Sequence, residues 1–410
     1  MKKVILMLAV AAMASCSKSD VESRPVVPVV GDVEIVSASK VSVITRTPFE
    51  GTLDDKANNK LTAYVYATKL DNTNAYVSYD AANLAAEGYM TFVSSNTQDG
   101  ATSKYPVAAV GFQKEDTATP GTYVADPQYY PSNDNPLYMV GLVPAVKADW
   151  TMDADSKVAT HAIDGKTDIM ASAVTKMNNG TDAIQKSKAS ATVYPTFTFK
   201  HKLTLVNVKV YTPTQKEQEA WGKITKIELV SVNGVAAGVN QNCDVTLETG
   251  VAAWTGAAAG ETTPFYAYNT TDKYTDKLIS TDDDKTADAD ANFGAVEIAT
   301  AATAEGTATD ADAQYVAYSM IAPFTTKSTG TKITNMVLKV YTEKNTDGIE
   351  APIGGLYETT DVHPDTGTIY AGSTEGKKFD VTLKFVGKEI KASATVTDWE
   401  PVYAGEVEII

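Results

Sequence analysis

Few residues of this 410-residue chain have the type and spacing that enzymatic chemistry requires. Its histidines are His161, His201 and His363, and none lies in an HExxH or similar metal-binding spacing. No GxSxG nucleophile motif and no Walker glycine loop occurs. Cys243, in NQNCDVTL, has no nearby histidine, which favours a small buried residue over a nucleophile. We therefore predict no catalytic, cofactor-binding or metal-binding residue, with a glycosidase-type carboxylate pair left open because no pairing can be assigned.

An acidic segment at residues 270–314 is the one stretch with a partial metal-binding pattern. Asp288, Asp290, Asn292 and Gly294 resemble the start of a calcium loop. The glycine comes one place late, however, and the twelfth position is Ala299 rather than glutamate. The richness in Asp, Thr and Ala predicts a solvated surface insertion rather than a calcium site or part of a core.

His201 lies in the strand-like stretch FTFKHKL, where it shares parity with apolar residues on both sides. A histidine on an apolar strand face is most often a core residue with a satisfied hydrogen bond, and we predict that role over a catalytic one. After Leu205 the apolar parity switches to Val206, Val208 and Val210, which predicts a β-bulge.

Cys16 indicates export and lipid attachment. Residues 1–15 have a basic start and a brief apolar run, too short for a permanent membrane helix, and they read as a secretory signal. Met13-Ala14-Ser15-Cys16 resembles a lipobox, in which the cysteine thiol is acylated. A plain signal peptide with a chance cysteine is the alternative. With Cys16 lipidated, Cys243 has no partner for an internal disulfide.

Val33–Thr47 is the stretch around which we expect the chain to be organised. Its apolar residues alternate in a period-2 strand pattern, and the strand ends at Arg46. Arg24 and Arg46 are the only two arginines in the sequence. The apolar face is formed by Val33, Ile35, Val41 and Val43. An arginine-specific protease cutting between Arg46 and Thr47 would leave the rest whole and could free a sheet edge. The alternative is an ordinary solvated arginine at a strand end.

Composition and patterning predict an all-β protein of two or three domains. The net charge of −16 argues against nucleic-acid binding. Beyond Thr47 most segments are strand-like, with possible helices at Asp80–Glu87 and near Pro213–Trp221. Strands are predicted at Leu61–Ala67, Ala75–Tyr79, Tyr105–Phe112 and Leu137–Val143. The 21 tyrosines, some alternating with small apolar residues as in AYVYA, suit a half-wet strand surface, and a glycan-binding surface is the alternative.

Several motifs, taken in order, resemble the fimbrillin family of Bacteroidales, the subunits of type V pili. The stretch from Phe197 to Leu203 resembles the family's F-x-F-x-H-x-L strand, and Thr167–Ala171 resembles the short strand upstream of it. ITKIELVSV and AYSMIAP fit later strands, and FDVTLKFVGKEIKASATVTDWEPV resembles the closing hairpin with its tryptophan, here Trp399. The lipobox and the strand before Arg46 extend the resemblance over the whole chain.

The resemblance implies two tandem β-sandwich domains of transthyretin-like type and a division of the chain. Expected are a lipoprotein signal peptide at 1–15, a propeptide with the removable strand at 16–46, sandwich domains at 47–190 and 191–398, and a donor strand at 399–410. The resemblance implies that a surface arginine-specific protease removes the propeptide, and that the vacated groove accepts the C-terminal strand of another subunit. The donor residues would be Val402, Ala404, Val407, Ile409 and Ile410.

The expected function is therefore a structural subunit of a cell-surface fimbria that serves adhesion or colonisation. The expected partners are other copies of the chain, other fimbrial subunits, the protease, the outer membrane through the precursor's lipid, and host or bacterial surface glycans or proteins. Pairing of the tail within its own chain is the alternative to donor exchange. A tip or anchor subunit, and a glycan-binding surface lipoprotein that never polymerises, are the alternative functions.

Overall fold

The computed structural model describes residues 36–38, 60–69, 82–93, 109–130, 137–173, 184–186, 197–231, 242–256, 262–269, 273–280, 292–301, 306–323, 325–326, 336–352, 372–373, 375–387, 389–398 and 402–403. These residues form mostly antiparallel β-strands. The all-β fold predicted from the sequence is confirmed. Within the described ranges no helix is long and apolar enough to cross a membrane.

Two sheets make up what we call the N-terminal body. The larger has the order β27 (Val402–Tyr403), β12 (Thr198–His201), β10 (Met170–Ala173), β7 (Leu137–Val143), β2 (Lys60–Lys69), β3 (Leu84–Val93), β5 (Gln113–Glu115) and β6 (Tyr123–Ala125), with β11 (Ile184–Lys186) also paired to β7. The smaller has the order β16 (Ala252–Thr255), β15 (Asn242–Thr246), β9 (Val158–Ala162) and β8 (Thr151–Asp153). A separate pair joins β1 (Val36–Ala38) to β4 (Ala109–Gly111).

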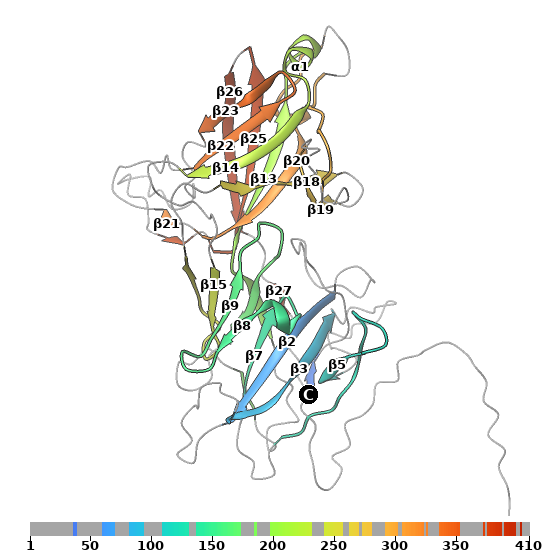
Figure 1. Cartoon of the computed structure of the whole chain (residues 1–410), viewed down its shortest axis with the longest axis vertical. Helices are drawn as coiled ribbons and strands as arrows, with labels where there is room; N and C mark the ends of the chain where they lie inside the picture. Colours follow the sequence, from blue (N-terminus) through green and yellow to red (C-terminus); the bar gives the residue numbers. More distant parts are fainter. Residues whose placement is uncertain are drawn as a thin grey trace, which may run out of the picture.

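The C-terminal body, which lies above the N-terminal body in Figure 1, is a sandwich of two sheets. One has the order β19 (Lys273–Leu278), β18 (Tyr266–Asn269), β20 (Gln314–Ile321), β13 (Thr204–Tyr211), β25 (Lys377–Val386) and β26 (Glu389–Asp398). The other has the order β17 (Thr262–Pro264), β14 (Ile224–Ser231), β22 (Met336–Thr342) and β23 (Asn345–Pro352). The remaining elements are α1 (Gln215–Trp221), the 3₁₀ turns η1 (Lys147–Asp149) and η4 (Asp310–Asp312), and the pair β21 (Thr325–Thr326) and β24 (Gly372–Ser373).

The core of the C-terminal body follows from period-2 alternation on facing strands. On β25, Phe379, Val381, Leu383 and Phe385 are fully buried, while the residues between them are half-exposed. They pack with the inward residues of β14 and β22, among them Ile227, Leu229, Leu338 and Val340. Burial of so much apolar surface is the main stabilising contribution to such a sandwich.

Strand β2 confirms one predicted face and corrects the other. Leu61, Ala63, Val65 and Ala67 are fully buried on one side, as predicted. Tyr64 and Tyr66, expected at a half-wet surface, are also buried, because the other face of the sheet packs into a second core together with residues of β9 and β15. The alternation of side chains along a strand does not by itself tell whether one face or both faces of that strand are buried.

The parity switch in the His201 stretch also has a different cause from the predicted bulge. Leu205 packs into the core that β13 shares with the N-terminal body, whereas Val206, Val208 and Val210 pack inside the C-terminal sandwich. Both faces of β13 are buried, so no change of phase is needed at Leu205. A register shift does occur in the pairing with β20, but between Val208 and Lys209.

Two further predictions are wrong. The possible helix at Asp80–Glu87 falls partly on β3, because residues from Leu84 onward pair with β2, and tertiary pairing overrides helix propensity there. The segment 270–314, predicted as a surface insertion, contributes Ile279 and Ile298 to the core of the C-terminal body.

The second predicted helix is confirmed as α1. It begins after Thr214, whose side chain accepts a hydrogen bond from the backbone N–H of Glu217, with Pro213 just before the cap. Strand pairs also cross residue 190, the predicted domain boundary: β12 pairs with β10, and β15 pairs with β9. Where the chain divides into domains stays a prediction.

Candidate functional site

The described part of the predicted removable strand is β1. Val36 lies opposite Gly111, Ser37 opposite Val110 and Ala38 opposite Ala109 in an antiparallel pair with β4. β4 falls inside the strand predicted at Tyr105–Phe112. Its role as the partner of the N-terminal strand was not predicted, since no local sequence signal indicates which strand pairs with which.

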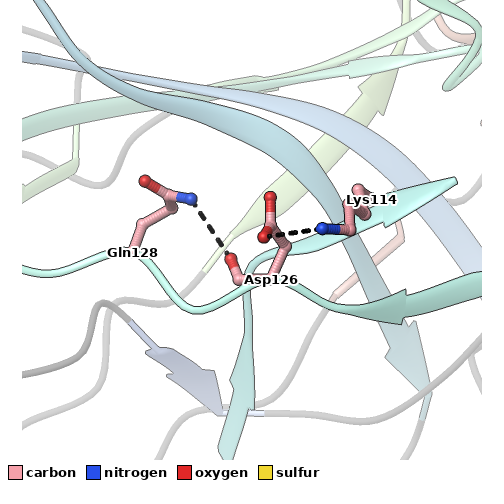
Figure 2. Close-up of polar contacts among 3 residues, drawn as sticks. All are labelled: Lys114, Asp126 and Gln128. Atoms are coloured by element: carbon pink, nitrogen blue, oxygen red, sulfur yellow. Dashed lines mark hydrogen bonds and ion pairs between the residues drawn. The ribbon is translucent and has the colours of Figure 1, made fainter.

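The residues that follow β4 form a hairpin with contacts of its own. The Phe112 side chain is buried, and its backbone oxygen accepts a hydrogen bond from the Asp126 N–H at 2.8 Å. Figure 2 shows two further contacts of Asp126: its carboxylate lies 3.3 Å from Lys114 Nζ, and its backbone oxygen accepts from Gln128 Nε2 at 3.3 Å. β4 is therefore continuous with the β5–β6 hairpin, which pairs with β3 through Gln113 opposite Tyr89.

The opposite edge of the large sheet is occupied by the start of the predicted donor strand. Val402 lies opposite Phe199, and Tyr403 lies opposite Thr198, in an antiparallel pair of β27 with β12. For these two residues the structure shows pairing within the same chain, the alternative stated for the tail.

Of the predicted site residues, the structure describes one and leaves the others outside its described ranges. Val402 is described, at the edge of β12. The remaining predicted positions lie outside the described residues: Cys16, Val33, Ile35, Val41, Val43, Arg46, Thr47, Ala404, Val407, Ile409 and Ile410.

Strand β12 is anchored by buried side chains. The ring of Phe199 approaches Gly141 of β7 so closely that a Cβ added there would lie 2.7 Å from the ring. His201 Nδ1 lies 3.1 Å from the Asp168 carboxylate, and both side chains are fully buried. This pairing confirms the prediction of a core histidine with a satisfied hydrogen bond, because a buried polar group without a partner would be costly.

The other candidate chemical groups show no catalytic arrangement in the described ranges. Cys243 is a free, buried thiol, and burial raises its pKa to about 12, so it is protonated and unreactive at neutral pH. His161 Nδ1 lies 2.7 Å from the Ala162 backbone oxygen. Among the described residues no group of three or more potential metal ligands is found, and His363 lies outside them.

Buried contacts join the two bodies. The Met320 N–H of β20 donates to the Gly165 backbone oxygen at 2.7 Å, and the Tyr266 hydroxyl donates to the Asp164 backbone oxygen at 2.8 Å. Burial, followed by the Asp164 charge, raises the pKa of Tyr266 to about 12. These contacts couple the C-terminal body to the sheet that carries β12 and β27.

One cavity of about 650 Å³ lies between α1 and the β25–β26 hairpin. Its polar lining includes Lys216, Lys384 and Lys391, and no aromatic side chain lines it. The most exposed large apolar side chains in the described ranges are Val124, Tyr129, Val251 and Phe293. Half-buried tyrosines do come together elsewhere: the ring centroids of Tyr89 and Tyr123 lie 4.7 Å apart, and those of Tyr268 and Tyr315 lie 5.1 Å apart.

No protein-family model matches the sequence, and no curated protein matches it. Solved structures that the chain matches include a candidate cell adhesion protein from Bacteroides uniformis, at 13% identity, covering 91% of this chain and 100% of that one with a TM-score of 0.44. A fimbrial protein from Bacteroides vulgatus has 14% identity, 70% and 84% coverage and a TM-score of 0.30. The C-terminally truncated tip fimbrial protein Mfa3 from Porphyromonas gingivalis has 10% identity, 90% and 100% coverage and a TM-score of 0.31.

Proposed function

We propose that the chain is a structural subunit of a cell-surface fimbria that polymerises by strand exchange after cleavage between Arg46 and Thr47. The observation that carries the proposal is the pairing of β1 with β4. The described part of the N-terminal segment thus occupies a strand position beside β4.

Cleavage would convert β4 into an acceptor edge. Loss of β1 leaves the backbone N–H and C=O groups on that side of Ala109–Gly111 without their strand partner. An unpaired strand edge binds a new strand through main-chain hydrogen bonds, while the side chains of the incoming strand provide specificity. The incoming strand would be the tail of a second copy, with Ala404, Val407, Ile409 and Ile410 as its apolar residues, because Val402 pairs with β12 of its own chain.

The N-terminal residues direct the chain to the cell surface. Acylation of Cys16 holds the precursor in the outer membrane, and the protease that cuts at Arg46 releases the subunit from its lipid. The absence of a catalytic arrangement in the described ranges is compatible with a structural role in adhesion. A subunit that keeps its lipid and resists cutting would instead be an anchor.

The test is limited digestion of the folded precursor, without residues 1–15, by an arginine-specific protease. N-terminal sequencing should show a product that begins at Thr47, and native size analysis should show polymers that appear as SDS-resistant ladders. Arg46→Lys should abolish both, while the matched change Arg24→Lys should leave cleavage at Arg46 and polymerisation unchanged.

Two results would contradict the shaft-subunit proposal in different ways. A product cut at Arg46 that stays monomeric, with or without its tail, favours a tip subunit or a glycan-binding lipoprotein. A precursor in which Arg46 resists the protease favours an anchor or a lipoprotein that does not polymerise.

A further inference from the structure

Strand β26 has a long free edge. All ten of its residues pair with β25 in one continuous register, from Val386 opposite Glu389 to Lys377 opposite Asp398. On its other side β26 has no strand partner among the described residues. Figure 1 shows β26 at the side of the C-terminal body, next to β23.

Several other edge strands in the described part of the chain carry features that discourage pairing. β23 contains Asp347 and Glu350, a glycine with positive φ, and a terminal proline. β19 carries three charged residues, and β17 has three residues and ends in proline. β6 and β8 have three residues each, and β16 has four. Short length, charge and proline are the usual protections of a sheet edge.

β26 lacks these protections along most of its length. Six consecutive residues, Ala392–Thr397, are uncharged, and the strand contains no proline and no register shift. Its charges are confined to Glu389 and Lys391 at one end and Asp398 at the other. The outer face presents Ser393, Thr395 and Thr397, all exposed, whereas the inner face packs Ile390, Ala392 and Ala394 toward the core of the sandwich.

We propose that β26 is an interaction surface on which a second copy of this chain pairs its own β26, antiparallel, so that two subunits join side by side. A two-fold axis perpendicular to the sheet makes such an interface self-complementary and closed. Because each copy carries a net charge of −16, two copies repel each other overall. The uncharged run of β26 offers a contact without like charges.

The sequence of β26 fits one register best. With Ser393 opposite Ser393 of the second copy, Ala392 meets Ala394, Ile390 meets Val396, and Lys391 meets Thr395. No like charges then lie opposite each other, and apolar residues meet apolar residues on the inner face. Centring the pair on Ala394 would place Ile390 opposite Asp398, which is less favourable.

The first experiment measures self-association of the uncut precursor by sedimentation equilibrium, in a chain with Cys16→Ser and without residues 1–15. We expect a concentration-dependent dimer. Thr395→Lys, which places a lysine opposite Lys391 of the second copy, should weaken dimerisation at least tenfold. The control Thr151→Lys makes the same change at an exposed position of the edge strand β8 and should have no effect. A monomer at every concentration, or a dimer that Thr395→Lys leaves unchanged, would overturn the proposal.

A cross-link tests the register separately. Ser393→Cys in the same chain should form a disulfide-linked dimer on mild oxidation, since Cys243 is buried, whereas Thr151→Cys should not. Equal cross-linking of both variants would contradict the β26 interface. Neither experiment requires cleavage at Arg46, so failure of strand exchange in the digestion test and failure of side-by-side pairing are separate outcomes.

Discussion

Val402 lies directly opposite Phe199, so the first residues of the proposed donor tail are paired with their own chain. Phe199 belongs to the F-x-F-x-H-x-L stretch and is fully buried. The tail thus begins as an edge strand of the N-terminal body, so under the strand-exchange proposal the donor would be the part that follows Tyr403.

Removal of residues 404–410 should therefore abolish polymerisation while leaving the stability of the folded chain nearly unchanged. The truncated precursor keeps β27 and its pairing with β12, so its free energy of unfolding should stay within about 0.5 kcal/mol of the full chain. After cleavage at Arg46 it should form no SDS-resistant ladder, because most of the apolar donor residues are gone. Urea unfolding and gel analysis of the same preparations provide the two readouts. Ladders of normal length from the truncated chain would show that the donor lies elsewhere.

The close approach of Gly141 to Phe199 predicts a second effect. Gly141→Ala places a methyl group 2.7 Å from the Phe199 ring and should lower the free energy of unfolding by about 1–3 kcal/mol. Phe199→Leu on its own should also destabilise, because it removes buried aromatic surface.

Combining the two substitutions supplies the control. The leucine makes room for the methyl group, so the double variant should be more stable than the sum of the single effects predicts. Denaturant unfolding of the four proteins measures this coupling. Simple additivity would mean that the ring and Gly141 do not constrain each other.

The buried pair of His201 and Asp168 should contribute to stability rather than to activity. His201→Ala removes one partner and leaves a fully buried carboxylate with one contact fewer, at a cost of roughly 3 kcal/mol. His201→Gln keeps a hydrogen-bond donor and should cost less. Thermal and urea unfolding of both variants measure the difference, and equal stability of His201→Ala and the parent chain would refute the assignment.

The local sequence pattern correctly predicted elements that have a clear apolar run or a clear helix cap. The apolar run Leu137–Val143 became β7 with the same bounds, and the threonine before Gln215 caps α1. The pattern failed for the helix predicted at Asp80–Glu87, where alanines favour a helix but pairing with β2 from Leu84 onward produces a strand. It also failed for Tyr64 and Tyr66, because the cover over that face comes from β9 and β15, distant in sequence.

The candidate site shows even more clearly that local sequence does not indicate which strands pair. The sequence indicated an N-terminal strand, a cleavage position and an apolar tail, each from local composition. It gave no indication that β1 pairs with β4 or that β27 pairs with β12, since the choice of strand partner depends on long-range contacts. The core position of His201 could be predicted from strand parity alone. Its partner Asp168 could not, because it lies 33 residues away in the sequence.

The pKa of Cys243 makes a prediction about alkaline stability. Burial raises it from 9.0 to about 12 in the folded chain. The folded thiol therefore keeps its proton above pH 9, while the thiol of the unfolded chain loses it. The stabilising contribution is fully present below pH 9 and is lost as the pH rises toward 12. At pH 10.5 the loss should be roughly 2 kcal/mol, from about 1.4 kcal/mol for each pH unit above 9.

Cys243→Ala isolates this contribution from the tyrosines that titrate in the same range. Between pH 8 and pH 10.5, in the presence of a reductant, the free energy of unfolding of the parent chain should fall more steeply than that of the alanine variant. Alkylation of the native thiol at pH 8.5 should be slow and should accelerate only as urea unfolds the N-terminal body. Parallel pH profiles, or rapid labelling of the native chain, would show that the thiol is accessible and that its proton is not held by burial.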